Sequence, residues 1–202
     1  MGYYLPTRDE INSSWFERWG ETFGSPALAT KVLSNDRTSQ IAQERMFTAL
    51  GIDTKADIKP EDINAAQAYG ADKKRLAHMC GMVIHGEFLR TCISKSDFEI
   101  LSSVFTIEDL KTAISLSHLH QKQSDFTADM AKIEMLIEHS GKACISSWKT
   151  SLDEQIGMRI YLMETNEEQE EEFAHTIESS LARAIVIAVS NTFISETSLK
   201  AA

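Results

Sequence analysis

The stretch LAHMCGMVIHGEFLR, from Leu76 to Arg90, has the apolar periodicity of a helix but an unusual set of other residues. It contains two glycines, two histidines and a cysteine. A glycine in a helix interior costs about 1 kcal/mol relative to alanine, so Gly81 and Gly86 should return a packing advantage. The residues that form the apolar stripe of this predicted helix are Leu76, Met79, Cys80, Val83, Ile84 and Phe88.

The glycines predict a close crossing of two helices, because a residue without a side chain lets another backbone approach. A second long helical pattern, over residues 128–148, also contains an interior glycine, Gly141. Gly86 is also expected to end one helix, so that His85 and Glu87 turn inward and find hydrogen-bond partners. The predicted helix junction consists of Gly81, His85, Gly86, Arg90, Gly141 and Trp148.

Helical spacing extends over most of the chain of 202 residues, which contains only nine glycines and three prolines. Scarce turn residues favour helices over a sheet protein. We therefore predict an all-α fold, a single compact multi-helix domain over residues 1–202. One short strand pair is the alternative at residues 156–164, because Met158, Ile160 and Leu162 alternate with other residues.

The predicted helices fall into three regions. N-terminal helices occupy residues 7–70, a core follows over about residues 76–162, and a C-terminal helix covers residues 174–195. In the first region, residues 39–50 are predicted to form a helix that ends at Gly51. Its residues at helical spacing are Ile41, Arg45, Met46, Ala49 and Leu50. The next helix should begin at Pro60 and end at Gly70.

Within the core region, one helix is expected to begin at Ser96 and to direct Phe98, Leu101 and Phe105 inward. Thr106 is the predicted N-cap of the helix that follows.

Charge and composition exclude several classes of function. The net charge is −10, and no dense cluster of basic residues forms the electrostatic footprint of a nucleic-acid binder. Three cysteines without a CxxC pair fit a reducing compartment. The N-terminus does not resemble a signal peptide, and the most apolar run, residues 184–189, is too short to cross a bilayer. We expect a soluble cytoplasmic protein.

No motif for nucleotide, phosphate or serine-nucleophile chemistry occurs in the sequence. His118 and His120 point apart on a helix, and His78 and His85 are too far apart to share a zinc ion. Cys80 lies on the apolar stripe, as an inert core thiol would. We predict no catalytic residue, cofactor or metal. A helical hydrolase or metal enzyme using His78, His85 or His118 is the alternative.

Two segments are candidates for binding a partner protein. The acidic run of residues 164–173 is either a docking surface for a basic partner or a solvated loop. Its candidate residues are Glu167, Glu168, Glu170, Glu171 and Glu172. Aromatic residues of the first helix, Trp15, Phe16 and Trp19, are either exposed interface anchors or part of the core.

The helix containing HGEFLR and the segments after it resemble the SctK/YscK family, the cytoplasmic sorting-platform adaptors of bacterial type III secretion systems. The first group of matching residues is Gly81, Ile84, His85, Gly86, Leu89, Arg90, Ile93, Leu101, Ala113 and Ile114. A later group is Gly141, Ile145, Trp148, Arg159, Ile160 and Leu162. The resemblance covers roughly residues 76–162.

This resemblance implies a largely helical, non-catalytic adaptor on the cytoplasmic face of the injectisome at the inner membrane. Its partners would be the pod protein (SctQ type), which carries the stator and ATPase, and the cytoplasmic domain of the inner-membrane ring protein (SctD type). Neither nucleic acid nor membrane insertion is expected. A type III secretion chaperone, or another small helical protein-binding module, is the alternative function.

Overall fold

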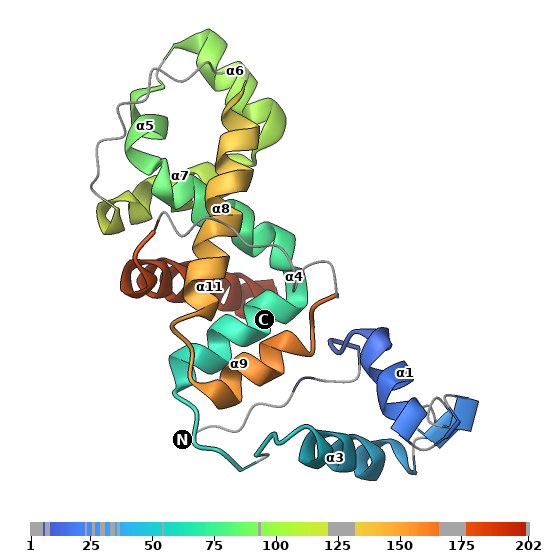
Figure 1. Cartoon of the computed structure of the whole chain (residues 1–202). Coiled ribbons are helices and arrows are strands. Elements are labelled where there is room, and N and C mark those ends of the chain that lie inside the picture. The colour runs from blue at the N-terminus through green and yellow to red at the C-terminus, as the bar shows by residue number, and fades with distance from the viewer. Residues whose placement is uncertain are drawn as a thin grey trace. The chain divides into compact units, whose positions relative to one another are not determined.

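The structure, a computed structural model, is all-α, as predicted: each secondary-structure element of the described residues is a helix (Figure 1). The chain divides into two compact units. The first unit is Met1–Ala71 with Asp153–Glu171, and the second unit is Asp72–Leu152 with Glu172–Ala202. The described residues are 6, 9–22, 24–25, 27–28, 31–32, 35, 37–53, 55–92, 94–120, 132–165 and 177–200.

The first unit forms around a cluster of apolar side chains from sequence-distant helices. Its labelled helices are α1 (Ser13–Thr22), α3 (Ser39–Ala49), the first part of α4 (Pro60–Ile84) and α9 (Glu154–Tyr161). The buried cluster comprises Ile11, Trp15, Trp19, Ala42, Met46, Phe47, Ile52 and Leu162. Polar bonds support it, since Asn12 N donates to Leu162 O at 2.9 Å and Tyr69 Oη donates to Glu164 Oε1 at 2.7 Å.

The end of α3 confirms the predicted role of Gly51. Its φ of 74° lies in the left-handed region, where a side chain would be strained. Gly51 N donates to Thr48 O at 3.1 Å, and Ile52 N donates to Phe47 O at 2.9 Å. This is the hydrogen-bond pattern of a Schellman motif, and both Phe47 and Ile52 enter the buried cluster.

Ile41 does not share the buried face of α3. Ile41 is 56% exposed, whereas Ala42, Met46 and Phe47 are the buried residues of α3. At about 100° per residue, Ile41 lies roughly 140° around the helix from Met46, so both cannot face one core. The exposed side of α3 therefore carries an aliphatic side chain.

The alternating segment after residue 155 is the helix α9, not a strand. Asp153 caps it by accepting a hydrogen bond from Gln155 N. Arg159 is 1% exposed, and its guanidinium donates to Gln155 O and, at 2.7 Å, to Asp53 O. Ile156 and Ile160 are buried on the same helix, so the segment is amphipathic in the helical sense.

Helix α4 begins at Pro60 as predicted but continues beyond Gly70. Glu61 and Asp62 occupy its first turn, where the helix dipole favours acidic residues. The backbone leaves helical geometry at Asp72, with φ −158° and ψ 83°, and then resumes to Ile84. The boundary between the two units falls at the same point. The break in helical geometry therefore falls two residues after the predicted end at Gly70.

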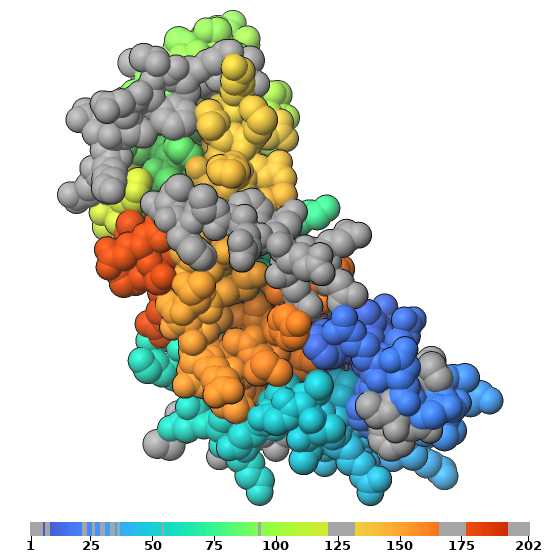
Figure 2. Space-filling model, in the orientation of Figure 1, coloured from blue at the N-terminus to red at the C-terminus, as the bar shows by residue number. Residues whose placement is uncertain are grey.

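The second unit contains the rest of α4 and the helices α5 (Gly86–Thr91), α6 (Lys95–Val104), α7 (Ile107–Leu116), η1 (Ser117–Leu119), α8 (Ile133–Lys149) and α11 (Ser179–Lys200). Helix α8 packs against α11, and it crosses α4. In its first half α8 exposes one side to solvent, and Figure 2 shows this part of the helix, in yellow, at the surface. Its exposed residues are Glu134, Met135, Glu138, His139 and Lys142.

Helices α6 and α7 of the second unit each begin at a side-chain cap. Ser94 Oγ accepts from Asp97 N, and Thr106 Oγ1 accepts from Asp109 N, both at 3.1 Å. The predicted Thr106 cap is therefore confirmed. Phe98 does not point inward as predicted; it is 47% exposed, while Leu101 alone is buried within α6. Apolar residues lie on more than one face of α6, so their spacing does not show which face is buried.

The C-terminal helix also differs from its predicted bounds, since α11 starts at Ser179 rather than at residue 174. Within the described residues, no helix combines the length and apolar character that crossing a membrane requires.

Candidate binding groove

Two features of the described residues are candidates for function: the helix junction in the second unit and an apolar groove in the first. The junction contains the predicted backbone contact between α4 and α8. A Cβ atom added at Gly81 would overlap the carbonyl oxygen of Ile137, and one at Gly141 would overlap that of Ala77. Each glycine thus lies directly against the backbone of the other helix.

Gly86 approaches a different helix from the one predicted. An added Cβ there would lie 2.5 Å from Ser117 Cβ and 3.2 Å from Ala113 O, so its neighbours are α7 and η1 rather than α8. The predicted helix end is present, because α4 stops at Ile84 and α5 begins at Gly86. The resulting turn at His85 redirects the chain towards α7.

His85 joins the turn to α8. The side chain is 6% exposed, and its Nε2 lies 2.9 Å from Ser140 Oγ. Burial, with a smaller repulsion from His120, lowers the pKa of His85 from 6.5 to about 4. The imidazole is therefore neutral at pH 7 and acts as a hydrogen-bonding group of the junction.

The remaining polar groups of the junction bond to one another. Ser117 Oγ donates to Glu87 Oε1 at 2.9 Å, and Arg90 Nη2 donates to Ser117 Oγ at 3.0 Å. Arg90 also reaches Ile114 O at 3.5 Å, near the end of α7. Trp148 is fully buried on the face of α8 that carries Gly141, two turns further on. These contacts give every residue of the predicted junction a structural position.

The junction contains no exposed nucleophile. Burial, together with Cys144, raises the pKa of the Cys80 thiol, so the thiol stays protonated at neutral pH. His118 Nδ1 lies 2.9 Å from Ser115 O, and His120 Nδ1 lies 3.1 Å from Ile84 O. In the part of the chain that the structure describes, no three histidine, cysteine or acidic residues gather as a metal ion would require.

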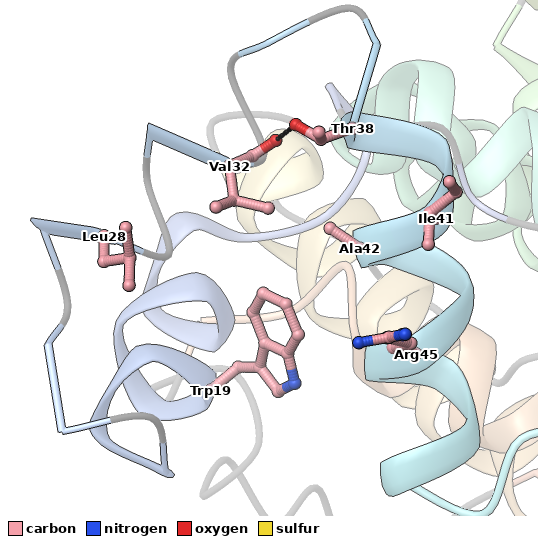
Figure 3. Close-up of a pocket in the computed structure, with 7 residues that line it drawn as sticks. All are labelled: Trp19, Leu28, Val32, Thr38, Ile41, Ala42 and Arg45. Atoms are coloured by element: carbon pink, nitrogen blue, oxygen red, sulfur yellow. Dashed lines mark hydrogen bonds between the residues drawn. The ribbon is translucent and has the colours of Figure 1, made fainter.

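The apolar groove is a hollow of about 310 Å³ on the first unit. Helix α3 forms one wall, and Trp19 of α1 lies opposite (Figure 3). Thr38, the N-cap residue of α3, donates from its Oγ1 to Val32 O at 2.7 Å. The lining residues are Trp19, Leu28, Val32, Thr38, Ile41, Ala42 and Arg45.

Exposed apolar side chains make the groove accessible. Leu28 is 54% exposed and Ile41 is 56% exposed, while the floor at Ala42 and Trp19 is buried. Such residues lose contact with water when a partner covers them, and this loss is favourable. The groove is therefore suited to receive apolar side chains.

Among the described residues that line the groove, Arg45 alone is charged. It lies one turn after Ile41 on α3, and its side chain is exposed. No described residue makes a hydrogen bond or an ion pair with its guanidinium. A carboxylate brought into the groove would find five N–H donors beside an apolar surface.

The three N-terminal aromatics belong mainly to the core. Trp15 is 8% exposed and packs edge-on against Tyr161, with ring centroids 5.2 Å apart. Trp19 is 9% exposed and turns one part of its indole towards the groove, while Phe16 is half-buried against the cluster. Only Trp19 thus combines a core position with a place in a candidate binding surface.

The acidic candidates Glu167, Glu168, Glu170, Glu171 and Glu172 lie outside the described residues. The groove itself was not among the sequence predictions, because helical spacing alone does not show which face of α3 is buried. Helix geometry gives only a partial signal: Ile41 and Arg45 share a face that lies away from Met46.

Comparison of the chain with protein-family models, with curated proteins and with solved structures finds no match.

Proposed function

We propose that the chain is a non-catalytic adaptor of a bacterial type III secretion sorting platform. In this function it links the cytoplasmic domain of the inner-membrane ring protein (SctD type) to the pod protein (SctQ type), which carries the stator and ATPase. It would act in the cytoplasm, against the inner-membrane face of the injectisome. The proposal combines the sequence resemblance with the binding groove of the first unit.

The observation that carries the proposal is the groove beside Trp19. Its rim exposes Leu28 and Ile41 by more than half, and beside them Arg45 carries a positive charge that no described residue pairs with. A surface of this kind favours binding to another polypeptide, because apolar side chains supply affinity and a charge supplies orientation.

The residues that carry the resemblance support the same proposal from a different direction. Gly81, Gly86 and Gly141 lie in close contact with neighbouring helices, and Leu89 is buried. His85 is neutral and bonded to Ser140. Residues with such positions serve to build a scaffold, which is what an adaptor needs from its core.

A type III secretion chaperone, or another small helical protein-binding module, is the second candidate, since the groove would serve either role. A chaperone of this kind should be a stable homodimer that holds an unfolded effector segment. The mass of the isolated chain in solution distinguishes the two, because an adaptor requires no homodimer.

The test is pairwise co-purification. The tagged chain is co-expressed with the pod protein, and separately with the ring protein's cytoplasmic domain, from the same bacterium. Light scattering then gives the mass of each eluted complex. We expect a complex of defined stoichiometry with each protein that survives 0.5 M salt, at about which concentration surface charge attraction is strongly screened. A chain that elutes alone in both experiments would overturn the proposal.

A further inference from the structure

We propose that the groove lined by Trp19, Ile41 and Arg45 seats one amphipathic helix of a partner protein, whose apolar side chains enter the groove and whose carboxylate pairs with Arg45. That the helix belongs to a partner of this chain rests on the proposed function. Which residues of this chain contact the partner helix follows from the groove alone.

A helix fits the surroundings of the groove better than an extended peptide. Peptides that bind as strands need a sheet edge with unpaired backbone groups. Each element of the described first unit is a helix, and the groove lies beside two of them, α1 and α3. A groove that binds a helix needs an apolar lining and no unpaired backbone groups. Trp19, Val32 and Ala42 provide such a lining.

The size and openness of the groove favour side chains over a cofactor. A volume of about 310 Å³ lies at the low end for a small-molecule site. Such sites usually enclose most of their ligand, whereas Leu28 and Ile41 here stand half exposed at the rim. A partner helix would cover these two residues while inserting only its anchors.

Arg45 sets the charge of the occupant. It follows Ile41 by four residues on α3, so the two side chains lie on one face about one turn apart. A binding helix that places an apolar residue on Ile41 therefore brings a residue one turn away to the guanidinium. An aspartate or glutamate there gains a charge-assisted hydrogen bond, and a lysine meets repulsion.

The groove can be tested without a known partner. The chain contains three tryptophans, and each gives a separate indole N–H signal in a nitrogen–proton NMR spectrum of the labelled full chain. Trp19 lines the groove, while Trp148 is fully buried in the second unit and serves as the internal control. The probe is a synthetic helical peptide of about 16 residues, with leucines along one face and a glutamate one turn from the central leucine.

We expect the glutamate peptide to shift the Trp19 signal in a saturable manner and to leave the Trp148 signal in place. The matched peptide with lysine for glutamate should bind about fivefold more weakly or worse. Ile41→Asp should weaken binding of the glutamate peptide about tenfold or more, since it places a charge in the apolar trough. Arg45→Glu should reverse the preference between the two peptides.

Neighbouring residues of α3 supply matched controls. Gln40→Asp introduces the same charge as Ile41→Asp, and Glu44→Arg is a charge reversal beside Arg45, yet neither residue lines the groove. The affinity of both variants for the peptide should lie within about twofold of that of the original chain, a change smaller than the loss of one typical contact would cause. Circular dichroism melting shows which variants remain folded.

A Trp19 signal that neither peptide moves would overturn the inference, as would equal binding of both peptides. If dodecanoate moves the Trp19 signal and the glutamate peptide does not, the groove is a small-amphiphile site instead. A homodimer that Ile41→Asp dissociates would assign the groove to a second copy of this chain.

The same four variants then enter the co-purification experiment. If the peptide binds as expected but neither secretion protein does, the groove stands and the proposed function fails. If the secretion proteins bind Ile41→Asp and Arg45→Glu as tightly as the original chain, their interface lies elsewhere and the inference fails while the proposed function stands.

Discussion

Replacing Gly81 by alanine should destabilise the second unit, although alanine is the better helix former. A Cβ at this position would overlap the carbonyl oxygen of Ile137 and lie 2.8 Å from its carbonyl carbon. Carbon atoms pack best at about 3.5 to 4.0 Å, so α4 and α8 must separate by roughly 1 Å. The obstacle is backbone, which cannot rotate away as a side chain does.

Two opposing terms set the size of the effect. Overpacking of a well-filled core typically costs about 1–3 kcal/mol, and a rigid neighbour places Gly81→Ala at the upper end. Better helix propensity returns about 1 kcal/mol. The net expectation is a loss of about 2 kcal/mol, which in a chain of this length lowers the melting temperature by roughly 4–8 °C.

Gly157→Ala is the matched control. Gly157 lies inside α9, and an added Cβ there meets nothing within 4 Å. The same substitution should therefore stabilise the first unit by about 0.5–1 kcal/mol, with the opposite sign.

The assay must follow the two units separately, because they can unfold at different denaturant concentrations. Urea titration monitored by the indole signals does so: Trp148 reports on the second unit, and Trp15 on the first. A Gly81→Ala chain whose Trp148 signal survives to the same urea concentration as in the original chain would show that α4 and α8 are not in backbone contact.

Three further predictions concern groups that the structure places in the core. Between pH 7 and 5, His85 becomes protonated in the unfolded chain (pKa 6.5) but stays neutral in the folded chain (pKa about 4), so the free energy of unfolding should fall by about 2 kcal/mol. Urea unfolding at both pH values measures this fall. The fall should be correspondingly smaller for His85→Gln. Arg159→Ala leaves Asp53 O without its hydrogen-bond donor and should lower the free energy of unfolding of the first unit by about 3 kcal/mol, measured through the Trp15 signal. A loss no larger than that of a typical surface substitution would contradict the burial of Arg159. Gly86→Leu should cost about 3 kcal/mol or more because Ser117 fills the space, and a variant that melts like the original chain would show Gly86 to be exposed.

The helix crossing could be predicted because its signal is chemical rather than periodic. Glycine inside a helix is unfavourable, so Gly81 and Gly141 in two long apolar patterns pointed to a backbone contact. The partner of Gly86 could not be predicted in this way. A glycine shows that another part of the chain approaches closely, but the same signal fits α8 as well as Ala113 of α7 and Ser117 of η1.

Caps and turns were also predictable, because each is decided by a few adjacent residues. Thr106 with Asp109, and Gly51 after α3, have the local chemistry that ends or begins a helix. Burial was less predictable. Ile41 and Phe98 are apolar at helical spacing, yet both are more than 40% exposed, because tertiary packing selects one of several apolar faces.

The groove lay beyond sequence analysis for the same reason. It requires Trp19 of α1 and Ile41 of α3 to be brought together, and no local pattern encodes that distance. Arg45 gave no signal of its own, since an exposed arginine on a helix is common.

Simultaneous binding of both secretion proteins tests whether this chain links them. The purified chain, the pod protein and the ring protein's cytoplasmic domain are mixed, and the mass of the eluted species is measured by light scattering. We expect one species that contains all three proteins and does not form when the chain is omitted. Two mutually exclusive binary complexes, or three separate proteins, would contradict it.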